Sequence, residues 1–162
     1  MKQILYYSWN GKTRICAEAA AKLLHAGLTE IQERYPRKKG FFGFLRSGYE
    51  ATKQKTAEIQ MLPALTADTV VLAFPVWASK TPPAVNTALR TLDFNGRRVI
   101  AIITMGGAAK QIPCYDILTE QVQQRGGTVA AIIPVVTGGT SEEQWEATLK
   151  RELTRLGELE SR

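Results

Sequence analysis

The stretch Ser8-Trp9-Asn10-Gly11-Lys12-Thr13 joins an apolar run at residues 4–7, typical of a buried strand, to an Ala-rich, helix-like segment at residues 14–24. Side-chain hydroxyls and an amide, backbone N–H groups freed by Gly11, the positive end of the helix dipole and the Lys12 charge can converge on one phosphate in such a loop. The same residue types also form ordinary turns and helix N-caps. The loop alone therefore leaves both interpretations open.

Two later stretches favour the phosphate-binding interpretation over an ordinary turn. They are Phe74-Pro75-Val76-Trp77-Ala78-Ser79-Lys80-Thr81-Pro82-Pro83 and Ile103-Thr104-Met105-Gly106-Gly107, and each follows a strand-like run and precedes a helix-like one. With three such loops in this order, the sequence resembles the flavodoxin-like family, in particular its short FMN-binding members with a P-V-W segment after the third strand. The resemblance extends over nearly the whole chain.

Strands and helices alternate along the chain, whose 162 residues suit a single domain, 1–162. Apolar runs predict strands at residues 4–7, 28–33, 69–74, 99–103 and 129–136, with helices at 12–25, 40–53, 82–92, 113–125 and 142–156. We expect Gly27 to stop the first helix, Thr81 to cap the third with Pro82 at its first position, and Ser141 with Gln144 to form a capping box. The expected fold is a flavodoxin-like three-layer αβα sandwich, a five-stranded parallel sheet of order 2-1-3-4-5.

An insertion at residues 34–56 follows the second predicted strand, where a simple α/β unit has a short loop. It carries the whole net charge of +6, because the rest of the chain has equal numbers of basic and acidic residues. Phe41, Phe42, Leu45 and Tyr49 recur at helical spacing, so we expect a short helix whose apolar face packs against the domain. On that basis neither nucleic acid nor a membrane is expected as a partner. The basic residues of this segment are Arg34, Arg37, Lys38, Lys39, Arg46, Lys53 and Lys55, and the acidic one is Glu50.

Several other kinds of site are disfavoured by the sequence. Cys16 and Cys114 are too few for a disulfide framework and are expected to be free, partly buried thiols. With His25 as the only histidine, at a predicted helix end, the sequence suggests neither a metal site nor a Ser-His-Asp triad. No apolar run reaches the length of a membrane span, and no signal peptide is recognisable, so a cytoplasmic protein is expected.

The three loops should meet beyond the carboxyl ends of the strands, at the point where the strand order reverses. We expect Trp77, in a segment stiffened by prolines, to stack on the flavin ring, although a Trp packed between helices is the alternative. Gly106 and Gly107 would admit backbone N–H groups to the polar ring edge, or form a simple turn. The family resemblance implies FMN contacts at Ser8, Asn10, Gly11, Thr13, Pro75, Val76, Trp77, Ala78, Thr104, Gly106 and Gly107. Trp9, Lys12 and Met105, in the same loops, complete the candidate cofactor-binding residues.

Two departures from the family pattern are visible. Ser8 and Asn10 stand where the T-x-T-G-x-T phosphate loop usually has threonines, but both keep hydrogen-bonding groups. The loop after the fourth strand also lacks the aromatic residue that covers the outer flavin face in many electron-carrier flavodoxins.

Three functions remain open from the sequence. The first is an FMN-binding redox protein that transfers electrons between protein or small-molecule partners, and the second is an FMN-dependent NAD(P)H:quinone-type reductase. The third is an interaction module without flavin. The basic segment would attract an acidic redox partner protein or NAD(P)H, or it is simply solvated. A monomer or a homodimer is expected, and no residue stands out as catalytic.

Overall fold

Five parallel strands form one sheet in the computed structural model, which describes residues 1–108 and 111–159. In chain order they are β1 (Lys2–Tyr6), β2 (Gly27–Glu30), β3 (Thr69–Pro75), β4 (Arg98–Met105) and β5 (Thr128–Val136). Their order across the sheet is β2-β1-β3-β4-β5, as predicted. β1 and β3 are neighbours, with Leu5 opposite Leu72, so the strand order reverses between them.

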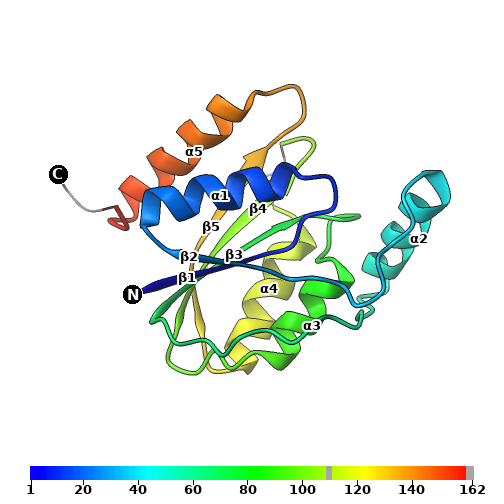
Figure 1. Ribbon diagram of the computed structural model, residues 1–162, viewed down its shortest axis with the longest axis horizontal. Coiled ribbons are helices and arrows are strands. Elements are labelled where there is room, and N and C mark those ends of the chain that lie inside the picture. The colour runs from blue at the N-terminus through cyan, green and yellow to red at the C-terminus, as the bar shows by residue number, and fades with distance from the viewer. Residues whose placement is uncertain (109–110, 160–162) are drawn as a thin grey trace.

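Helices cover both faces of the sheet. They are α1 (Lys12–Leu24), α2 (Phe41–Thr52), α3 (Pro83–Thr91), α4 (Pro113–Gln124) and α5 (Glu142–Arg155). Figure 1 shows α1 and α5 on one face and α3 and α4 on the other, whereas α2 stands to the side of the sheet. The predicted three-layer sandwich is therefore confirmed.

Alternating residues of the central strands fill two separate cores. In β3, Val71 and Ala73 pack with α1 and α5, while Leu72 and Phe74 pack with α3 and α4. Because both faces of this strand are buried, its sequence is a continuous apolar run rather than an alternating one. This is why the central strands can be recognised in the sequence by their continuous apolar runs.

Two of the predicted helix ends are wrong in detail. The left-handed residue that ends α1 is His25, with φ 49°, and Gly27 instead begins β2. Pro82 is the N-cap of α3 and Pro83 its first residue, because the Thr81 hydroxyl donates to the Asn86 side chain inside the fold. The capping box at Ser141 is confirmed at the start of α5.

The insertion stands on a short antiparallel stem. The Arg34 N–H donates to the Glu58 carbonyl at 2.8 Å, and the Gln60 N–H donates to the Gln32 carbonyl at 2.8 Å. The predicted helix is present as α2, but the prediction that its apolar stripe packs against the domain is wrong. Ser47 and Ala51 are its buried residues, and the large apolar side chains face solvent.

The two cysteines are free and fully buried, and burial raises the pKa of both thiols to about 12. Among residues 1–108 and 111–159, no grouping of His, Cys, Asp and Glu could hold a metal ion. Within the same ranges, no helix is both long and apolar enough to cross a bilayer.

Candidate functional site

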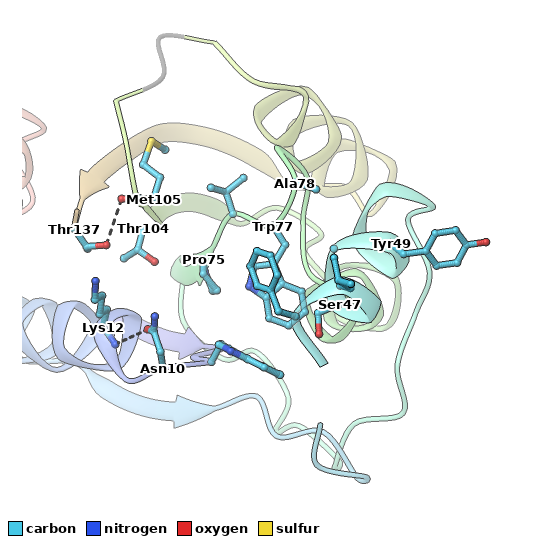
Figure 2. Close-up of a pocket in the computed structure, with 16 residues that line it drawn as sticks. Asn10, Lys12, Ser47, Tyr49, Pro75, Trp77, Ala78, Thr104, Met105 and Thr137 are labelled. Atoms are coloured by element: carbon cyan, nitrogen blue, oxygen red, sulfur yellow. Dashed lines mark hydrogen bonds between the residues drawn. The ribbon is translucent and has the colours of Figure 1, made fainter. Parts of the chain in front are cut away.

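A cavity of about 760 Å³ lies at the carboxyl ends of β1, β3 and β4. Three loops far apart in the sequence form its walls, and α2 closes one side. Figure 2 shows Asn10 and Lys12 on one side of the opening, Thr104, Met105 and Thr137 on another, and Trp77 between them and α2. The predicted loops therefore meet at the strand-order reversal, where open parallel sheets bind their ligands.

The loop after β1 is shaped by its own polar side chains. Ser8 Oγ accepts hydrogen bonds from the N–H groups of Gly11 at 3.1 Å and Arg14 at 3.3 Å, and Asn10 Oδ1 accepts from the Lys12 N–H at 3.2 Å. Gly11 has φ 92°, a left-handed conformation that a side chain would strain. The loop is thus closed by its own hydrogen bonds, at the N-terminus of α1, whose positive end lies on the Lys12 side of the cavity.

Thr13 ties this loop to the next part of the site. Its hydroxyl lies 2.7 Å from that of Thr104 at the end of β4, and both residues are buried. A hydrogen bond between residues 91 positions apart in the chain fixes the distance between the loop after β1 and the loop after β4.

Trp77 forms an aromatic wall with two neighbours. Its ring meets Trp9 edge to face, with centroids 5.3 Å apart, and Tyr7 at 5.7 Å. A tight turn presents it, because Trp77 and Lys80 exchange two backbone hydrogen bonds of 2.9 Å across Ala78 and Ser79. Ala78 and Ser79 both have positive φ, at 47° and 63°. Two successive strained residues hold Trp77 at the cavity wall rather than between helices.

Arg37 holds the outer side of this wall. Its guanidinium lies 5.4 Å from the Trp77 ring centroid, and it pairs with Glu33 at 2.8 Å and with Glu50 of α2 at 2.6 Å. Desolvation raises the pKa of Glu33, an effect that Arg37 opposes. Burial also acts to raise the pKa of Glu50, but Arg46 and Arg37 outweigh it, so this pKa lies below its usual value. The network couples α2 to Trp77.

The far side of the cavity rests on the loop after β5. The Thr137 N–H donates to the Met105 carbonyl at 2.8 Å, which continues the pairing of β4 and β5 past their ends. Gly138 follows, and a Cβ atom there would lie 2.0 Å from the Gly106 carbonyl oxygen. Only glycine allows this close approach, so the Gly106 loop is seated directly on the Gly138 backbone.

The structure places most predicted site residues on the cavity and leaves their binding roles as predictions. Ser8, Gly11, Thr13 and Gly107 do not line it: Ser8, Gly11 and Thr13 shape its walls, and Gly107 is exposed beside it. The predicted residues that line it are Trp9, Asn10, Lys12, Pro75, Val76, Trp77, Ala78, Thr104, Met105 and Gly106.

Sequence reasoning missed a second set of lining residues. One is Thr137, which the β4–β5 pairing brings beside Met105, and the others come from α2. The available signal was topological, since the insertion leaves the end of β2, next to the loop after β1. The missed residues are Phe44, Leu45, Ser47, Gly48, Tyr49 and Thr137.

The arrangement suits a ligand with a flat ring and an anionic tail. Two indole rings, Met105 and the α2 side chains supply apolar contact, while Lys12 and the N-terminus of α1 supply positive charge at one end. A volume of about 760 Å³ lies within the usual range for sites that bury most of such a ligand.

Comparison with known proteins gives matches to one family. The family model described as Flavodoxin matches residues 2–124, and no curated protein matches the chain. A provisionally assigned flavoprotein of Bacteroides uniformis has a TM-score of 0.77 at 22% identity, covering 94% of this chain and 97% of that one. A flavoprotein of Lactobacillus acidophilus in complex with FMN has a TM-score of 0.69 at 20% identity, covering 82% and 91%. A Streptococcus pneumoniae flavodoxin has a TM-score of 0.59 at 14% identity, covering 96% and 97%.

Proposed function

The chain belongs to the flavodoxin family, and from this premise we propose that it binds FMN in the cavity and transfers electrons through it. The observation that carries the proposal is the meeting of three loops at the strand-order reversal, with charge at one end and aromatic rings at the other. The fold neighbour from Lactobacillus acidophilus was solved with FMN, which supports the same choice of cofactor.

Each part of FMN has suitable partners in this site. Lys12 would hold the phosphate together with the backbone N–H groups at the start of α1, where phosphate oxygens would replace Asn10 Oδ1 and Ser8 Oγ as acceptors. Trp77 and Trp9 would contact the ring, and the Gly106 backbone would face its polar edge. When bound, FMN supplies reversible one-electron and two-electron transfer.

The protein's own contribution is to bind, orient and tune. Trp77 gives apolar contact on the ring face, which raises the free energy of negative charge placed beside it. Lys12 and the α1 dipole favour negative charge at the phosphate end. The Arg37 guanidinium, behind Trp77, is paired with Glu33 and Glu50, so it supports the position of the indole without adding net positive charge.

A second candidate function is an NAD(P)H-dependent reductase that passes electrons through FMN to a quinone-type acceptor. The basic charge of the insertion favours it, because an anionic dinucleotide would be attracted to the side of the cavity that α2 forms. Anaerobic addition of NADPH or NADH to the FMN-loaded protein separates the two. Bleaching of the flavin within seconds supports the reductase, and a flavin that stays oxidised supports an electron carrier reduced by another protein.

Trp77→Ala tests the proposed ring contact. Loss of the indole should weaken FMN binding by about tenfold or more, because aromatic overlap and apolar burial are both removed. The measurement is a fluorescence titration of FMN with each protein. Tyr35→Ala is the matched control, since Tyr35 is an exposed aromatic of the insertion outside the cavity lining. Equal affinities for the two variants would refute the role of Trp77.

A further inference from the structure

The amphipathic pattern of α2 is inverted relative to an ordinary packed helix. Its exposed side carries large apolar side chains: Phe41 is 70% exposed, Phe42 84%, Leu45 49% and Tyr49 56%. The buried residues of the helix are small, Ser47 and Ala51, and Phe44, which lines the cavity, is 69% exposed. Figure 1 shows the helix projecting from the side of the sheet. The exposed fractions show that the rest of the described chain leaves about half or more of each of these side chains uncovered.

Such a stripe is costly in water. Burying apolar surface is worth roughly 25 cal/mol per Å², and soluble monomers seldom leave several adjacent large side chains exposed. Phe41, Leu45 and Tyr49 are four residues apart and therefore form one continuous line along the helix, beside Phe42. A contiguous stripe of this kind marks a surface that contacts something apolar.

The charged residues that flank the exposed apolar stripe of α2 are basic. Lys38 and Lys39 precede the helix, and Lys53 follows it, with no ion pair to any of them among the described residues. The one acidic residue of the segment, Glu50, points inward and is bound by Arg37 and Arg46. The outer face of α2 is therefore apolar and basic, with its acidic group neutralised.

A recess of about 880 Å³ adjoins the stripe. Lys38, Lys39 and Arg46 line it together with Phe41 and Phe42. Three carboxylates, Glu33, Glu50 and Glu58, also line it, but each is paired with an arginine. Cationic side chains thus stand around a hollow directly beside the exposed phenyl rings. This is the pairing that an anionic headgroup attached to an apolar chain would use.

We propose that α2 is a docking element for an anionic lipid surface. The phenyl rings would enter the boundary between headgroups and acyl chains, and the flanking lysines would contact the headgroups, as in other interfacial amphipathic helices. A second copy of this chain is a poorer occupant, because it would bring the same basic charge against this face. The expectation from the sequence that no membrane is contacted depended on burial of this stripe, and that burial is absent.

The orientation has a consequence for the cavity, which rests on the proposed function. Phe44 and Leu45, on the same helix, line the cavity beside Trp77. Docking through α2 would hold this side of the cavity against the lipid surface. The redox partner would then belong to the class of apolar, ring-containing electron carriers dissolved in the bilayer.

Vesicle co-sedimentation tests the docking without depending on flavin. The full chain is mixed with vesicles of phosphatidylcholine alone and of equal parts phosphatidylcholine and phosphatidylglycerol. We expect binding to the anionic vesicles only, weakened by added salt. The double variant Lys38→Gln, Lys39→Gln should bind about 30-fold more weakly, given the usual contribution of one basic residue near an anionic surface. Phe41→Ser with Phe42→Ser should bind at least about tenfold more weakly.

Matched controls remove the same chemistry elsewhere. Met61→Ser removes an exposed apolar side chain outside α2, and Lys22→Gln removes a basic charge from α1; both should bind as the unaltered protein does. FMN titration of every variant tests the cavity separately, so a failure of docking and a failure of flavin binding are distinguishable.

Three results would overturn the proposal. One is absence of binding to anionic vesicles, and another is equal binding by all variants. The third is equal affinity for polyglutamate that is unaffected by the phenylalanine substitutions, which would assign the surface to an acidic protein instead.

Discussion

At the scale of single residues, Arg37 links the insertion to the candidate site. It contacts Glu33, Glu50 and the Trp77 ring while being only 12% exposed itself. Neither carboxylate has much access to water, and among the described residues Arg37 is the ion-pair partner of Glu33 and one of two partners of Glu50. Arg46 also pairs with Glu50, at the same 2.8 Å found for Arg37 and Glu33, but it is 79% exposed.

Arg37→Met should lower the free energy of unfolding by about 3 kcal/mol at neutral pH, because it leaves the poorly solvated Glu33 carboxylate without its partner and Glu50 with the exposed Arg46 alone. Arg46→Met is the matched control and should cost less than about 1 kcal/mol, as exposed pairs do. Urea denaturation of both variants measures the difference. Equal losses in the two variants would contradict the account of the network.

The pH dependence of this difference has a definite sign. The folded-state pKa of Glu50 is lowered, so its contribution to stability is present above the ordinary value of 4.5 and is lost as the pH falls through the lowered value. In Arg37→Met, protonation of Glu33 instead relieves an unpaired buried charge. The gap between variant and unaltered protein should therefore shrink as the pH falls toward 4.5, and a gap that widens would be inconsistent with this network.

The sequence could predict Trp77 but not Arg37. Trp77 lies between prolines in a short loop, and these sequence neighbours are enough to predict that its side chain is held at the cavity. Arg37 acquires its role from Glu50, 13 residues away, and from Trp77, 40 residues away. Such long-range pairings depend on how the insertion folds back, which residue types alone do not determine.

At the scale of elements, the strands were predictable and the orientation of α2 was not. Continuous apolar runs identified β3 and β4 because both faces of a central parallel strand are buried. The spacing of Phe41, Leu45 and Tyr49 correctly predicted a helix, since these residues share one face. Periodicity does not say whether that face packs inward, and here the small residues do.

The contact between two loops gives the prediction at this scale. Gly138→Ala should weaken FMN binding and lower the free energy of unfolding by about 1–3 kcal/mol, because the added Cβ would displace the Gly106 backbone. Gly27→Ala is the matched control, since a Cβ there meets nothing within 4 Å. FMN titration and urea denaturation of both variants provide the comparison. If Gly138→Ala behaves like Gly27→Ala, the Gly106 loop is not seated as described.

At the scale of the whole molecule, the sheet topology determines where the candidate site lies. Parallel strands joined by right-handed crossovers bring three distant loops to one edge of the sheet, and the strand order by itself predicts this meeting. The side of the cavity that α2 forms comes from an insertion, and the rules for parallel sheets do not predict its position. The insertion also carries the net charge of +6. The general rules of the fold therefore do not describe the segment whose charge is best suited to select a binding partner.

The central claim is that these loops enclose one FMN per chain. Titration of FMN with the purified, unaltered protein, followed by flavin fluorescence, tests it most directly. The proposal predicts saturable quenching with an endpoint at equal amounts of FMN and protein, because the bound ring would lie against Trp77. Flavin fluorescence that stays unchanged in excess protein would contradict the account.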